Sequence, residues 1–201
     1  MIMRRILRSS AALLAAASAL SAQAQALAPM ADDAPLPPGV MAPVKMRDMT
    51  PAEKRAHQVW SLRAALNVAA LQCQFSPFLR TVKNYNLMLP HHSAELASAL
   101  KTMNDHFVRL DGAKTARRTF DQYTTRTYNS FSTLDAQLSF CQKASDIGWE
   151  ALAARKGSYA DIAEARLPEV RAAMMPKWNP LVLVQLGWLD VPGIANPCLD
   201  R

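Results

Sequence analysis

The sequence has little glycine and few cysteines, with six glycines and three cysteines among its 201 residues. A sandwich or barrel of strands needs many tight turns and many β-branched runs, so a chain poor in glycine and rich in alanine favours helices. Half of the residues are apolar, which is enough to build the core of one domain. The composition therefore predicts an all-α fold, a single-domain bundle of about four to six helices.

The chain also lacks the common motifs of catalysis and cofactor binding. No closely spaced cysteine pair is present, which excludes covalent c-type haem and a thioredoxin-like redox motif. There is no glycine-flanked nucleophilic serine and no zinc motif with its glutamate base. We therefore predict no catalytic and no cofactor-binding residue, although paired carboxylates from different elements leave no recognisable spacing.

The spacing of the histidines does not predict a metal site. His91 and His92 are adjacent, so their side chains are expected to point in different directions, and His106 follows about 21 Å further along the same predicted helix. Ligands that share an ion on one helix normally lie three or four residues apart. We interpret all three as helix-surface residues, with zinc or copper binding as the alternative, and we predict no metal ligand.

The first 24 residues have the order of a secretory signal peptide. Arg4, Arg5 and Arg8 precede an uncharged run over residues 9–20 that is rich in alanine and leucine. This run is too short to remain as a membrane anchor, and a buried helix is the alternative interpretation. Small residues predict cleavage after Ala24 or Ala26. A lipoprotein would have a cysteine directly after the apolar run, and none is present there. The protein is therefore expected to be periplasmic or secreted, with no stable membrane anchor after cleavage.

The charge of the expected mature chain is only mildly basic. Loss of the three leader arginines leaves 20 basic residues against 16 acidic ones, a net charge of +4. Such a surplus is compatible with an anionic envelope surface, but it is far from the clustered basic surface of a nucleic-acid-binding protein. We predict no nucleic-acid partner.

Proline and helix-capping residues divide the rest of the chain. Residues 25–49 are rich in proline and have no apolar period, which predicts a disordered linker. Thr50, Pro51 and Glu53 have the spacing of a capping box with proline at the first helical position, and they predict the start of a helical domain over residues 50–201. Within this domain, residues 176–201 are again broken by prolines and are predicted to form an irregular tail.

Apolar residues at three- and four-residue steps predict the helices of the domain. The first extends to about Cys73 and is apolar on nearly all sides in its second half, as expected for the centre of a bundle. We expect Pro90 to close the second helix, Gly112 to end the third and Ser158 to cap the last, which should stop before Pro168. A break is expected near Asn129, where hydroxyl and amide side chains are crowded.

In an oxidising compartment the three cysteines favour one disulfide. We predict a bridge between Cys73 and Cys141, because each closes a long apolar helical segment. Cys198 is expected to be free or joined to a second chain, although a flexible tail would also allow it to pair with either of the others.

One segment has the composition of a binding surface. Tyr123, Arg126, Tyr128 and Asn129 stand among threonines and serines, and they are our candidate contacts for a sugar or a peptide. The alternative is that the aromatic residues pack in the core and the hydroxyl groups face water. Three further cations upstream give the same helix a basic edge, which is usually a solvated face: Lys114, Arg117 and Arg118.

These observations favour a non-enzymatic role. We predict an exported binding or interaction protein of the cell envelope, with an envelope protein, a peptide or a glycan as its partner. An envelope hydrolase, or another helical enzyme whose active site has no recognisable motif, is the alternative. Titratable residues that converge in a pocket would favour the enzyme, and a groove without them would favour binding.

Overall fold

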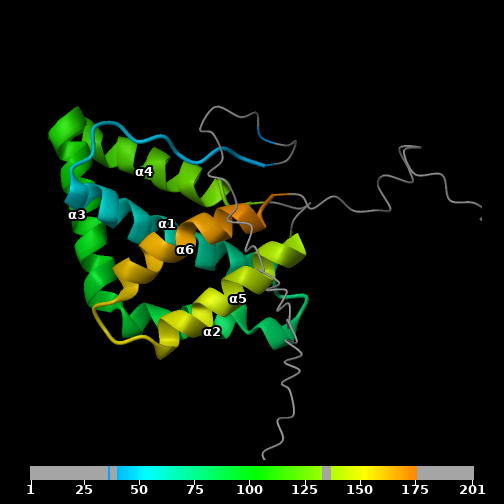
Figure 1. Cartoon of the computed structure of the whole chain (residues 1–201). Helices are drawn as coiled ribbons and strands as arrows, with labels where there is room; N and C mark the ends of the chain where they lie inside the picture. The colour runs from blue at the N-terminus through cyan, green and yellow to red at the C-terminus, as the bar shows by residue number, and fades with distance from the viewer. Residues whose placement is uncertain (1–35, 37–39, 133–136, 176–201) are drawn as a thin grey trace, which may run out of the picture. The chain divides into compact units, whose positions relative to one another are not determined.

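The computed structural model describes residues 36, 40–132 and 137–175, and all regular structure in these residues is helical. The predicted all-α bundle is confirmed (Figure 1). Its six α-helices are α1 (Pro51–Gln72), α2 (Thr81–His91), α3 (Ser93–Asp111), α4 (Ala113–Asn129), α5 (Gln137–Ala153) and α6 (Tyr159–Ala173), and a short 3-10 helix (Pro77–Leu79) lies between α1 and α2. None of the described helices is long and apolar enough to cross a membrane.

α1 begins at the predicted capping box. The backbone N–H of Glu53 donates to the Thr50 hydroxyl at 3.3 Å, and the backbone N–H of Thr50 donates to the Glu53 carboxylate at 2.8 Å. Both bonds satisfy donors that a helix start leaves unpaired. Two predicted helix ends are also present. Gly112 follows the end of α3 with a positive φ of 74°, and α4 ends at Asn129.

α1 is the central helix of the bundle and packs against each of the other five. Its buried residues lie on nearly every side, and many of them are alanines that let neighbouring helices approach closely. Leu62, Ala64 and Ala65 have no exposed surface. The predicted position of this helix in the middle of the bundle is confirmed.

A disulfide joins Cys73, at the end of α1, to Cys141 in α5. The two Cα atoms are 5.6 Å apart, and neither cysteine has exposed surface. The predicted pairing is confirmed. Cys198 and the predicted tail over residues 176–201 lie outside the described residues, as do the predicted signal peptide and its cleavage sites.

Of the two prolines expected to close helices, Pro90 is followed by the end of α2 at His91, whereas α6 continues past Pro168 to Ala173. Pro90 lies inside α2 and Pro168 lies inside α6. Proline removes the hydrogen bond to the carbonyl four residues earlier, which belongs here to Asn86 and to Glu164. All four residues are exposed, so water can hydrate the freed carbonyl groups and α6 continues past its proline.

Residues at the junction between α2 and α3 form hydrogen bonds with the end of α5 and the start of α6. His92 Nε2 donates to the Ala151 carbonyl and His91 Nε2 donates to the Ala154 carbonyl, both at 2.8 Å, at the C-terminal end of α5. Glu95 accepts backbone N–H bonds at the start of α6, from Gly157, Tyr159 and Ala160 at 3.1 to 3.2 Å. The junction therefore supplies partners for both helix ends.

Two expectations about this region were wrong. Ser158 does not cap α6 with its side chain, because its hydroxyl donates to the Arg155 carbonyl and Glu95 takes the capping role. The histidines are not all surface residues, since only 2% of His92 and 1% of His106 is exposed. Both rings are buried because they have polar partners inside the bundle: Glu95 for His92 and Glu53 for His106.

Part of the predicted linker lies along the bundle. Residues 40–49 form no helix, but Val44 and Met46 pack against the core. Arg47 forms an ion pair with Asp111 at 2.6 Å. This segment thereby covers one side of α3 and α4 and forms part of the walls of two cavities.

Candidate functional site

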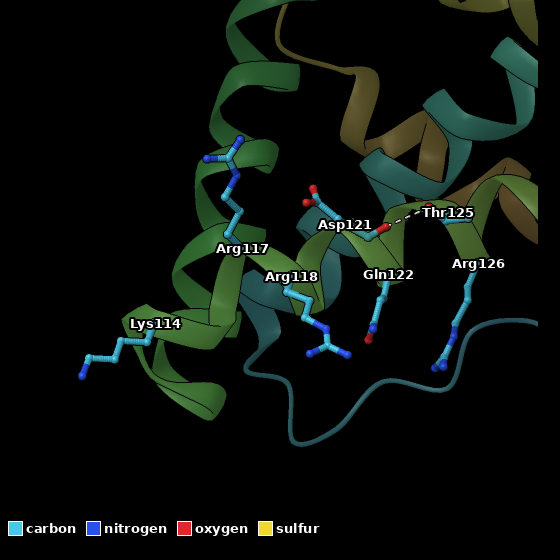
Figure 2. Close-up of a pocket in the computed structure, with 7 residues that line it drawn as sticks. All are labelled: Lys114, Arg117, Arg118, Asp121, Gln122, Thr125 and Arg126. Carbon is cyan, nitrogen blue, oxygen red and sulfur yellow. Dashed lines mark hydrogen bonds between the residues drawn. The ribbon is translucent and has the colours of Figure 1, made fainter.

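A groove of about 600 Å³ runs along the exposed face of α4. Figure 2 shows the seven residues that line it: Lys114, Arg117, Arg118, Asp121, Gln122, Thr125 and Arg126. All seven are exposed, so the groove is open to solvent. A partner that binds here would lie on the surface and would not enter the core.

The helical period of α4 explains why these polar residues share a face. Ala116, Phe120, Tyr123 and Thr127 recur at steps of four and three, and they are buried or partly buried against the core. Polar residues at the intervening positions therefore project away from the bundle. In Figure 2 the side chains of Arg118, Gln122 and Arg126 extend toward the same side, each four residues from the next.

The groove carries cations without acidic partners. Lys114, Arg117, Arg118 and Arg126 form no ion pair with any carboxylate in the part of the chain that the structure describes. Four arginines of other faces do form ion pairs with carboxylates: Arg47, Arg55, Arg109 and Arg166. Asp121 is the single acidic residue of the lining, so the groove has a net charge of +3.

Two of the four candidate ligand contacts, Tyr123 and Arg126, line one small cavity of about 110 Å³ beside the extended segment before α1, and the other two do not join them. Arg126 also lines the groove, whereas Tyr123 is buried against the core. The Tyr128 hydroxyl is half-buried and accepts a hydrogen bond from Arg63 at 2.7 Å. Asn129 is exposed at the end of α4. Of the predicted segment, Arg126 is the residue that joins the basic edge in a common surface.

Tyr123 instead contacts a histidine that the sequence did not single out. Its hydroxyl is 2.8 Å from His57 Nδ1. Burial lowers the pKa of His57 to about 4, and the nearby Arg171 charge acts in the same direction. Burial also raises the pKa of the Tyr123 hydroxyl. Both side chains are therefore neutral near pH 7, as a hydrogen-bonded pair inside a helical bundle requires.

His57 should make the protein less stable as the pH falls. Its pKa is about 4 in the folded state and 6.5 for an unperturbed histidine, so between these values the unfolded chain binds more protons and stability decreases with falling pH. We expect a loss of about 2 kcal/mol between pH 7 and pH 5 in urea unfolding. His57→Gln should remove most of this slope; an unchanged slope would contradict the assignment.

A second buried polar cluster secures the start of α1. The Arg109 side chain donates to both Glu53 oxygens, at 3.1 and 2.7 Å, and His106 Nδ1 lies 3.3 Å from the same carboxylate. The Arg109 guanidinium lowers the pKa of Glu53 to about 2. The ionised Glu53 carboxylate therefore contributes its full stabilisation above pH 4.5, and this contribution is lost as the pH falls toward 2. The loss occurs at lower pH than the loss of stability expected from His57.

The described titratable residues do not form a metal site. No group of three or more histidine, cysteine, aspartate or glutamate side chains is placed to hold a metal ion among residues 40–132 and 137–175. His57, Glu95 and Arg171 were missed in the sequence, because their partners lie in other helices. The basic edge of α4 was visible in the sequence, whereas its lack of acidic partners was not.

A scan of protein families and searches of curated proteins and of solved structures find no match to this chain.

Proposed function

We propose that this protein is a non-enzymatic binding protein of the cell envelope, and that the α4 groove binds an acidic peptide segment of its partner. The observation that carries the proposal is the set of four unpaired cations on one open face. From Lys114 to Arg126 the helix extends about 18 Å, which suits an extended chain better than a small molecule.

The groove chemistry supports a peptide with several carboxylates. Arginine presents a planar fork of N–H donors that matches a carboxylate in a bidentate geometry. Gln122 and Thr125 lie between the cations and supply amide and hydroxyl groups for the peptide backbone. Export is supported by the Cys73–Cys141 disulfide, because such bridges persist in oxidising compartments.

A binding measurement with a defined acidic peptide tests this proposal. A fluorescent glutamate-rich peptide should bind the purified protein at low salt, and binding should weaken with added salt because exposed charges are screened. A triple variant, Arg117→Gln, Arg118→Gln and Arg126→Gln, should bind at least tenfold more weakly.

The matched control removes three charges from other faces. Lys54→Gln, Lys83→Gln and Lys156→Gln change exposed lysines and give the same net charge as the groove variant. This control should retain the affinity within about twofold. Equal losses in both triple variants would show that only net charge matters and would overturn the groove assignment. Binding of an acidic glycan, with no binding of the peptide, would overturn the choice of partner.

The hydrolase alternative has its own test. The purified protein should show no turnover of ester, peptide or glycan substrates. Turnover that disappears when one residue is replaced would favour the enzyme and would contradict the non-enzymatic role.

A further inference from the structure

A separate cavity lies between α1, α4 and α6, away from the groove lining. It has a volume of about 210 Å³. Three elements and the extended segment before α1 contribute its walls: Pro43, Val44, His57, Gln58, Ser61, Thr127, Leu167, Pro168 and Arg171. The lining thus combines apolar side chains with hydroxyl, amide, imidazole and guanidinium groups.

Arg171 is held firmly at the wall of this cavity. Its guanidinium donates to the Ser130 carbonyl at 2.6 Å and to the Ser130 hydroxyl at 2.9 Å. The guanidinium carbon lies 3.7 Å from the centre of the Phe131 ring, in a cation–π contact. These bonds use two of the five N–H donors of an arginine, and they fix the orientation of the remainder.

No carboxylate neutralises this arginine. Among residues 40–132 and 137–175, Arg171 forms no ion pair, and burial lowers its pKa to about 10. The side chain therefore still carries its charge at pH 7. Arg171 is partly buried, and a charge withdrawn from water without a counter-charge is unfavourable, so an anion in the cavity would be bound more strongly here than at the protein surface.

We propose that this cavity is a second binding site, which takes a small organic monocarboxylate whose charge is held by Arg171. The carboxylate contacts the guanidinium and the neighbouring polar groups Gln58 and Ser61, because the Thr127 hydroxyl already donates to the Tyr123 carbonyl. The body of the ligand contacts Pro43, Val44, Leu167 and Pro168. A cavity of about 150 Å³ in another protein holds benzene, so the volume here fits a molecule of about the size of benzoate.

His57 contributes a neutral polar group to the same site. When the Tyr123 hydroxyl donates to Nδ1, the proton of the neutral ring is on Nε2, which is then a donor for the ligand. Because the ring is uncharged near pH 7, it does not compete with Arg171 for the carboxylate. The site therefore has one positive charge for one negative charge.

Benzoate is the probe that tests this inference. Isothermal titration calorimetry at pH 7 should detect its binding at millimolar or lower concentration, and the neutral isostere benzamide should bind at least tenfold more weakly. Arg171→Gln should also lower the affinity for benzoate at least tenfold. Absence of benzoate binding at millimolar concentrations would overturn the proposal, as would inorganic phosphate that binds as tightly as benzoate.

Two further variants separate the ligand contact from a general loss of structure. Arg63 also stacks on an aromatic ring, 4.8 Å from the centre of Trp60, and bonds the Tyr128 hydroxyl, but it does not line the cavity. Arg63→Gln should therefore leave the affinity for benzoate within about twofold. Val44→Trp should fill the cavity from the extended segment and reduce binding at least tenfold while Arg171 is intact.

The outcomes for the two sites are distinguishable. Unchanged benzoate affinity in either Arg171→Gln or Val44→Trp would overturn the monocarboxylate site. The triple groove variant should bind benzoate as the parent protein does, because none of its replaced arginines lines this cavity. Failure of the peptide measurement therefore leaves the cavity proposal standing, and the reverse also holds.

Discussion

Replacement of Cys73 and Cys141 by alanine is expected to lower the free energy of unfolding by about 4 kcal/mol. The disulfide joins residues 68 apart, and a cross-link of that span removes much of the conformational entropy of the unfolded chain. Alanine is the appropriate replacement because both cysteines are fully buried, where serine would introduce two hydroxyl groups into the core.

Urea unfolding of the double variant and of the parent protein measures this loss. A Cys198→Ala variant is the control, because Cys198 is predicted to be free or joined to another chain and its replacement should leave the stability of the monomer unchanged. The slope of the unfolding free energy against urea should increase in the double variant, since its unfolded chain is less restricted. A loss below about 1 kcal/mol would contradict the expected contribution of the disulfide.

Replacement of Glu95 by alanine should lower stability by about 3 kcal/mol. The carboxylate accepts three backbone N–H bonds at the start of α6 and lies 3.0 Å from His92 Nδ1. Alanine would leave these groups without partners at a junction where His92 is fully buried. Loss of a helix cap and loss of a partner for a buried polar group are both among the causes of large single-residue losses of stability.

A glutamate of α6 provides the matched control for this variant. Glu164 is largely exposed and contacts Arg55 at 3.3 Å, so Glu164→Ala should change stability by less than about 1 kcal/mol. Hydrogen exchange gives a second measurement, because the amides of Gly157, Tyr159 and Ala160 should exchange faster in Glu95→Ala. Equal losses in the two variants would show that Glu95 does not have the capping role that the structure gives it.

The sequence predicted those features of the fold that depend on neighbouring residues. The capping box at Thr50 and Glu53 and the stop at Gly112 are local patterns, and both are present in the structure. The pairing of Cys73 with Cys141 was also predictable, because two cysteines at the ends of apolar faces become buried together. Each of these inferences needed only short-range chemistry and the tendency of apolar surface to be buried.

Features that depend on distant residues were missed. Glu95 replaces Ser158 as the cap of α6 across 62 to 65 residues, and no spacing rule connects them. Pro168 did not end α6, because the consequence of a proline depends on whether water reaches the freed carbonyl group. The candidate contacts do not all meet for a similar reason: Tyr123 and Arg126 share a small cavity, whereas Tyr128 bonds Arg63 of α1 and Asn129 is exposed at the end of α4.

The central position of α1 has a consequence for the order of folding. This helix is synthesised before all five helices that cover it, and its ion pair with α6, between Arg55 and Asp161, spans 106 residues. Contacts of such long range form late and slow the folding of a chain. The most completely buried helix would therefore not be fully covered until α6 has emerged. For a chain that we predict to be exported, slow closure would keep the precursor unfolded while it passes through a secretion channel.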